Sequence, residues 1–111
     1  MTNHAGQLEQ LLISLPSENN YRSVSEINSI ITQYLKILDY VNGYNPEYKS
    51  ITRVYYSDIT NIRDHIQISL VGNSEPEKEY ALECAKKELK NDLSALALLI
   101  NQKSTVKDLS Y

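Results

Sequence analysis

The sequence of 111 residues has no tryptophan and no phenylalanine, and it contains only one cysteine, three glycines and three prolines. Because Cys84 has no second cysteine in the chain, an intramolecular disulfide is excluded, and we expect a reducing compartment, the cytoplasm. A glycine-rich phosphate loop is also excluded, since the three glycines are isolated from one another. The composition therefore argues against a disulfide scaffold and against the common nucleotide-binding loops.

Long hydrophobic runs are missing as well. The longest apolar run, residues 95–100, falls far short of the roughly 20 residues that cross a bilayer. No basic region followed by an apolar one opens the sequence, so we expect no secretory signal and no membrane partner. A net charge of −3 and a pI near 5.3 argue against direct binding to nucleic acid, which favours a basic face.

Groups for metal or acid–base chemistry are sparse. The two histidines, His4 and His65, are far apart in sequence, and no ligand set of metal-site spacing exists, so we expect no metal and no cofactor. Asp58 and Asn61 share one flank of a predicted helix with His65, where a carboxylate would orient a histidine base. No nucleophile accompanies them. We therefore expect a protein that is not an enzyme.

Helical periodicity predicts a first short helix and a second long one. The first covers residues 7–15, with leucines at helical spacing and Pro16 ending it. The second begins at a capping box, Ser23 to Glu26, and ends at Gly43, which we expect in the left-handed conformation just past the helix. Its apolar stripe is wide enough to contact two neighbours.

Two more long helices follow. The third opens at Asn45 and Pro46 and runs to about Val71, although residues 66–71 also alternate like a strand. The fourth opens at a second capping box, residues 74–77. Their predicted core stripes are Ile51, Tyr55, Ile59, Ile62, Ile66 and Leu70 for the third, and Leu82, Ala85, Leu89, Leu93, Leu96 and Ile100 for the fourth.

These segments predict an all-α fold, a small antiparallel helical bundle of three long helices plus one short N-terminal helix. The chain length fits one domain, residues 1–103, and we expect residues 104–111 to form a flexible C-terminal tail.

Nine tyrosines supply all the aromatic side chains except the histidines, and five of them fall within residues 39–56. Tyr34 and Tyr55 lie on predicted core stripes and need no functional explanation. Exposed tyrosine is enriched at protein interfaces because it gives large contact area at little entropic cost. We therefore predict a partner-binding surface formed by Tyr40, Tyr44, Tyr48 and Tyr56; local helix packing is the alternative explanation.

Acidic side chains gather at the start of the fourth helix, at Glu75, Glu77, Glu79 and Glu83. Negative charge there complements the helix dipole. It also forms an acidic patch for a basic protein, because carboxylates take the positions that nucleic-acid phosphates would occupy on a nuclease.

Two further surfaces give alternative functions. Arg53, Tyr56 and Arg63 share a polar stripe that suits a phosphate or a carboxylate, since the guanidinium group binds both. Leu98 lies opposite the core stripe of the fourth helix and suggests self-association, with a covering first helix as the alternative.

The function predicted first is a small acidic cytoplasmic binding protein that neutralises another protein by occupying it, in the manner of an immunity protein, antitoxin or inhibitor, with a basic nuclease toxin as one possible target. The alternatives are a module that sequesters a small phosphorylated molecule or nucleotide, and a helical adaptor that forms homo-oligomers.

Overall fold

A computed structural model describes residues 4–44 and 49–109, and this part of the chain folds into four helices without a strand. They are α1 (His4–Ile13), α2 (Tyr21–Tyr44), α3 (Lys49–Val71) and α4 (Glu75–Leu109). The prediction of a small all-α bundle is confirmed, and residues 66–71 belong to a helix. Of the alternating residues there, Ile66 is buried, whereas Ile68 and Leu70 are exposed.

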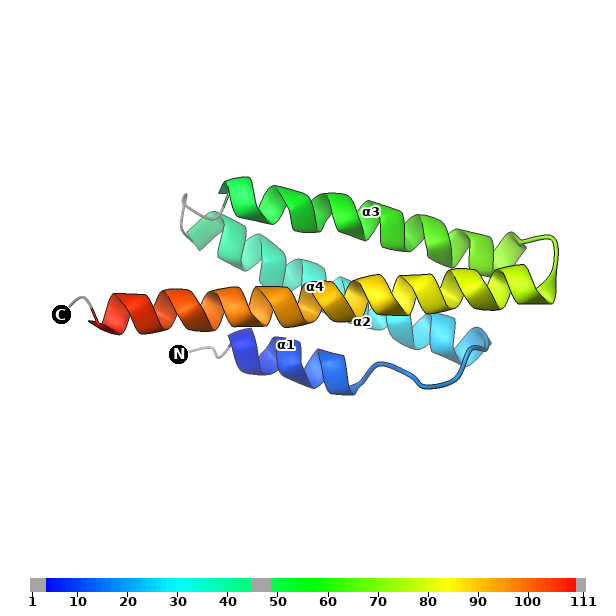
Figure 1. The fold of residues 1–111 in the computed structure, drawn as a ribbon, viewed down its shortest axis with the longest axis horizontal. Coiled ribbons are helices and arrows are strands. Elements are labelled where there is room, and N and C mark those ends of the chain that lie inside the picture. The colour runs from blue at the N-terminus through cyan, green and yellow to red at the C-terminus, as the bar shows by residue number, and fades with distance from the viewer. Residues whose placement is uncertain (1–3, 45–48, 110–111) are drawn as a thin grey trace.

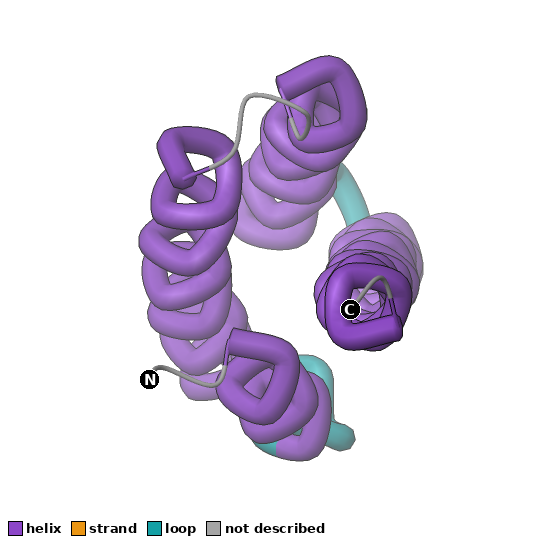
Figure 2. Tube along the Cα trace, turned by 90° about the vertical axis from the view of Figure 1, so that its left-hand side faces the viewer, coloured by secondary structure: helices purple, strands orange, loops and turns teal. Residues whose placement is uncertain are grey.

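The four helices alternate in direction and surround a common core (Figure 1, Figure 2). The longest, α4, packs closely against α3 and α1, whereas α2 approaches its neighbours less closely. The short α1 lies beside the middle of α4 rather than along its whole length (Figure 1). Both ends of the described chain point toward the same end of the bundle.

The core consists of apolar side chains from all four helices, as the helical periodicity predicted. Tyr34 and Leu89 are 0% exposed, and Ile59, Ile62 and Ile66 of α3 are buried. Leu70 was also predicted on the α3 stripe, but it is 38% exposed because it lies past the last buried turn. Other fully enclosed hydrophobic side chains of the described residues are Leu8, Ile27, Ile31, Leu38, Ala85, Leu93 and Leu96.

The start of α2 differs from the prediction. Asn20 caps the helix, since its side-chain oxygen accepts the Ser23 backbone N–H at 3.0 Å while the Asn20 N–H donates to the Ser23 hydroxyl at 3.2 Å. Ser23 itself is buried within the first turn, where its hydroxyl also donates to the Glu18 carbonyl. The capping box assigned to Ser23 and Glu26 was wrong, because Asn20 and Ser23 make the same reciprocal pattern three residues earlier.

The end of α2 also differs. The helix continues through Gly43 to Tyr44, and no glycine in the described chain has a positive φ. The left-handed cap predicted at Gly43 was therefore wrong. A side chain at this position would meet open space within 4 Å, so packing does not require glycine either. The predicted start of α3 at Asn45 and Pro46 lies outside the described residues.

The cap predicted at Ser74 is confirmed, but the reciprocal bond of Glu77 goes to Asn73, one residue before the expected partner. The Glu77 backbone N–H donates to the Ser74 hydroxyl at 3.3 Å, and the Glu77 carboxylate accepts the Asn73 N–H at 2.9 Å. At its other end α4 runs to Leu109, past the predicted domain boundary at residue 103. The flexible tail expected at residues 104–111 stays a prediction. The first helix starts at His4 and ends at Ile13, earlier at both ends than predicted.

Candidate functional site

The predicted tyrosine surface can be followed at Tyr40. Its side chain is 51% exposed near the end of α2, and its ring centroid lies 4.3 Å from that of His4 on α1, with the planes tilted by 45°. The side chain of Tyr44 and all of Tyr48 lie outside the described residues. Among the described side chains of the predicted cluster, Tyr40 is therefore the exposed one, and its ring contacts α1 at this end of α2.

Tyr40 stands at one end of an open groove between α1 and α2. The groove has a volume of about 770 Å³, and its floor is formed by the apolar side chains Leu11, Ile30 and Ile37. The rim is polar and carries one acidic and one basic residue; its members are Gln7, Gln10, Ser14, Glu26, Ser29, Gln33 and Lys36. Sequence reasoning missed this groove, because its width depends on how far α1 stands from α2.

Tyr56, predicted as a contact residue, has an internal role. It is half-buried on α3, and its hydroxyl donates a hydrogen bond to the Asp39 carboxylate on α2. Burial, together with the hydrogen bond and charge of Asp39, raises the pKa of Tyr56 to about 12. A second bond in the same seam runs from the Thr52 hydroxyl to the Asn42 side chain at 2.7 Å. Tyr56 thus joins α3 to α2.

The alternative phosphate site depends on Arg53 and Arg63, which are both exposed on α3. Ten residues separate them, which is about 15 Å along a helix axis at 1.5 Å per residue. A single phosphate does not span that distance. The two arginines and Tyr56 therefore do not converge on one ligand group in this arrangement.

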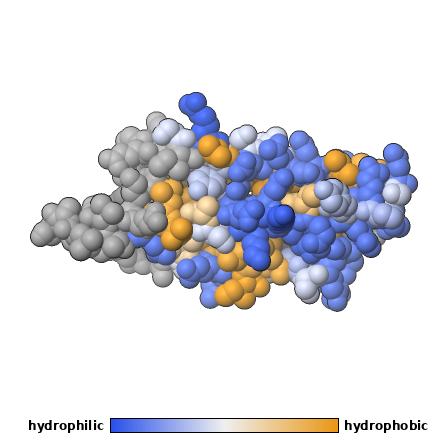
Figure 3. Space-filling view, in the orientation of Figure 1, coloured by the Kyte–Doolittle hydropathy of each residue, from blue (hydrophilic) through white to orange (hydrophobic). Residues whose placement is uncertain are grey.

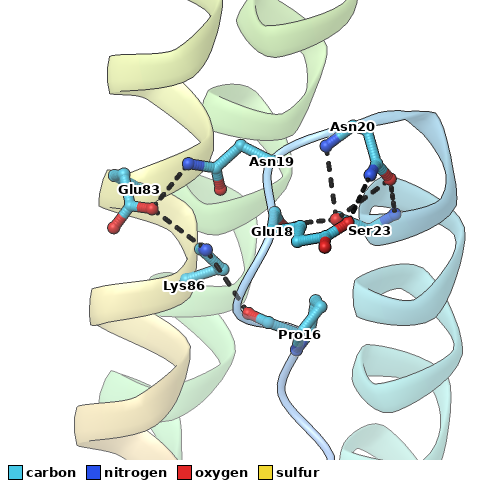
Figure 4. Close-up of polar contacts among 7 residues, drawn as sticks. All are labelled: Pro16, Glu18, Asn19, Asn20, Ser23, Glu83 and Lys86. Atoms are coloured by element: carbon cyan, nitrogen blue, oxygen red, sulfur yellow. Dashed lines mark hydrogen bonds and ion pairs between the residues drawn. The ribbon is translucent and has the colours of Figure 1, made fainter.

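The acidic residues at the start of α4 are largely engaged within the protein. Glu77 caps the helix, and Glu75 lies 3.6 Å from the Lys78 ammonium. Glu83 accepts a hydrogen bond from the Asn19 amide at 2.7 Å and pairs with Lys86 at 3.0 Å (Figure 4). These contacts, that of Asn19 first, lower the pKa of Glu83. Glu79 is exposed.

The tyrosine surface and the acidic residues lie at opposite ends of the bundle. Tyr40 is near the end of α2, whereas Glu75 begins α4 at the far end of α3 (Figure 1). The 23 residues of α3 separate the two ends by about 33 Å. The structure therefore does not bring them together into one contact patch.

A buried carboxylate between α3 and α4 was not predicted. Asp92 is 8% exposed, and its Oδ2 has no hydrogen-bond partner among the described residues. Burial raises the pKa of Asp92 to about 7, with further contributions from a hydrogen bond and the charge of Asp58, and from Glu88. A sequence signal existed, since Asp92 lies three residues after Leu89 and four before Leu96 on the buried face.

Tyr34 reaches the same polar region from α2. Its side chain is 0% exposed, and within the described part of the chain its hydroxyl has no hydrogen-bond partner. Burial raises the pKa of Tyr34 strongly, and the nearby charge of Asp92 adds to this effect. The core thus contains two neighbouring polar atoms, the Tyr34 hydroxyl oxygen and Asp92 Oδ2, that have no hydrogen-bond partner among the described residues.

The flank with Asp58, Asn61 and His65 does not form a histidine–aspartate pair. His65 Nδ1 lies 3.6 Å from the Glu88 carboxylate on α4. Asp58 instead interacts with Asp92, whose pKa it raises through a hydrogen bond and its charge. Asn61 is exposed. The absence of enzymatic activity stays a prediction.

Leu98, predicted as a self-association residue, is 58% exposed on the outer face of α4. Tyr80 is 73% exposed and lies 18 residues earlier, which is about five helical turns, so both point in the same direction. The face of the molecule in Figure 3 carries separate apolar patches among hydrophilic residues.

Within residues 4–44 and 49–109, no three His, Cys, Asp or Glu side chains are grouped as a metal site would require. In the same part of the chain, no helix has both the length and the apolar character of a membrane span. Comparison with protein-family models, curated proteins and solved structures finds no match for this chain.

Proposed function

We propose that this protein is a binding protein without catalytic activity, which acts by occupying a segment of another protein. The observation that carries the proposal is the position of Tyr40, an exposed tyrosine at the end of an open groove with an apolar floor. Exposed tyrosines beside a pocket are typical of residues that dominate protein interfaces.

The groove suits an amphipathic helix of the partner. Its floor is apolar, although Leu11, Ile30 and Ile37 are each at most 7% exposed, and the glutamine side chains of the rim offer both donors and acceptors. Binding of an amphipathic helix between two helices is a common mode of peptide recognition. Because Glu26 and Lys36 balance each other on the rim, we expect the bound segment to carry little net charge.

A neutralising role, as in an inhibitor or immunity protein, is the form of this function that we favour. The expectation of a basic nuclease as target depended on the acidic residues of α4. Glu77 and Glu83 are used in internal contacts, and these residues lie far from Tyr40. The proposal therefore does not require a basic partner.

The tagged chain is first used as bait to isolate the partner. The Kd of the purified partner is then measured for the wild type and the variants. Tyr40→Ala should raise the Kd by about 30-fold, the loss typical of an interface hot spot. Val54→Ala is the control, since Val54 is 60% exposed on α3, away from the groove. Equal affinity of the two variants would refute the proposal.

A second pair of variants tests the groove itself. Ser29→Arg places a long charged side chain on the rim, whereas Ser25→Arg makes the same change at an exposed position of α2 that does not line the groove. We expect loss of binding only with Ser29→Arg. Binding that survives Ser29→Arg would place the partner elsewhere.

Self-association through the outer face of α4 is a second candidate function, favoured by the shared direction of Tyr80 and Leu98. Two such side chains on one exposed helix face can pack against the same face of a second copy. Sedimentation of the wild type and of Leu98→Lys tests it. A wild type that stays monomeric at high concentration would exclude this function.

A further inference from the structure

A second groove lies on the other side of α1, between the end of that helix and α4. It has a volume of about 580 Å³, within the range of small-molecule sites. Its apolar side is formed by Leu12, Leu15 and Pro16, and its other side is α4 from Tyr80 to Lys90. Apolar surface is visible along the lower edge of Figure 3, where α1 lies in Figure 1.

Three lysines line this groove within five residues of α4: Lys86, Lys87 and Lys90. Glu83 is the acidic residue among the lining side chains, so the groove has an excess of positive charge although the whole chain has a net charge of −3. Positive charge concentrated in a hollow of a low-dielectric surface attracts anions from solution.

The three lysines have different roles. The Lys86 side chain is 11% exposed, and its ammonium both pairs with Glu83 at 3.0 Å and donates to the Pro16 carbonyl at 3.3 Å (Figure 4). It therefore fastens the α1–α2 connection to α4 and screens Glu83. Lys87 and Lys90 are exposed, and their long side chains can turn toward a ligand in the groove.

We propose that this groove binds a small amphiphilic anion, with its carboxylate or phosphate group at Lys87 and Lys90 and its apolar part against Leu12 and Leu15. An anion without an apolar part would leave the leucines unused, and an apolar molecule without charge would gain nothing from the lysines. The combination of the two surfaces selects a molecule that carries both features.

Cys84 provides a direct readout, because it is the only cysteine of the chain and lines this groove. The experiment measures the rate at which uncharged iodoacetamide alkylates Cys84 in the full chain. Decanoate and decyl phosphate are the anionic probes, while decanol and decyltrimethylammonium carry the same chain without negative charge. At a free probe concentration of ten times the Kd, one protein molecule in about eleven remains unoccupied, so alkylation should slow about elevenfold.

The double substitution Lys87→Gln with Lys90→Gln should raise the Kd for the anionic probe about fivefold or more, since two exposed ion pairs are lost. Arg22→Gln removes one exposed positive charge from α2, outside both grooves, and should leave protection unchanged. Lys86 is left intact because it holds the fold together at Pro16.

Protection by one or both anions, weakened by the double substitution, supports the proposal and identifies the preferred acidic group. Equal protection by decanol or by decyltrimethylammonium overturns it, because binding would then ignore charge. Alkylation that is not slowed by either anion at about 1 mM, the limit of weak binding, also overturns it.

Discussion

Replacing Asp92 with asparagine tests whether the α3–α4 interface contains a carboxyl group that is held in its protonated form. The pKa of Asp92 is raised from 3.8 to about 7 by burial and by Asp58. A group with a raised folded-state pKa binds its proton more tightly in the folded protein than in the unfolded chain. The stability that this proton provides is complete at low pH and is lost as the pH rises from about 4 to 7.

Each unit of pKa shift corresponds to about 1.4 kcal/mol, so the whole shift of about three units represents at most about 4 kcal/mol. Part of this loss occurs below pH 5. Between pH 5 and pH 8 we expect the free energy of unfolding of the wild type to fall by about 2 to 3 kcal/mol through Asp92 alone. The asparagine side chain does not ionise, so the Asp92→Asn variant should lack this fall.

The assay is urea unfolding followed by helical ellipticity, at pH 5 and pH 8, for the wild type and two variants. Asp64→Asn is the matched control, because Asp64 is exposed on α3 and the change removes the same formal charge. It also reports the pH dependence that the rest of the chain contributes. If Asp92→Asn changes the stability equally at both pH values, Asp92 does not hold a proton in the fold and the reasoning is wrong.

Four further substitutions test the core and the end of α2 by thermal or urea unfolding. Leu89→Ala should lower the free energy of unfolding by about 2 to 5 kcal/mol because Leu89 is 0% exposed. Leu98→Ala, at a side chain that is 58% exposed, should lower it by less than about 1 kcal/mol. Equal losses of stability in the two variants would contradict the assigned core. Tyr34→Phe removes a buried hydroxyl without a partner in the described chain and should raise the stability by about 1 kcal/mol, and a loss above that size would reveal a hydrogen bond. Gly43→Ala should add about 0.5 to 1 kcal/mol because Gly43 is helical with open space beside it, while destabilisation would indicate a left-handed glycine after all.

Much of the fold could be predicted because helix periodicity is a local property of the sequence. The spacing of Leu89, Leu93 and Leu96 identified a buried face without any knowledge of its neighbours, and all three are 0% exposed. Gly43 was misread because glycine after an apolar stripe usually marks a helix end, and no local signal revealed that α2 continues.

The candidate site was predicted less completely because its features depend on contacts between distant segments. Glu83 pairs with Lys86 on its own helix, but its other partner, Asn19, lies 64 residues away in the sequence, so that contact could not be predicted from α4 alone. Asp92 was not among the predicted site residues, because its burial depends on how the other helices pack against α4. Tyr40 was correctly expected on the surface, but the groove beside it depends on the spacing of α1 and α2.

The short helix α1 forms a wall of both grooves. Leu11 lines the groove toward α2, while its neighbour Leu12 lines the groove toward α4. A molecule that binds either groove only while α1 is docked shifts the equilibrium toward the docked state. By thermodynamic reciprocity, the first molecule then increases the affinity for the second by the same factor by which the second increases the affinity for the first. Binding in one groove thus changes the affinity of the other groove through the ten-residue helix α1 alone, without any change in the three long helices.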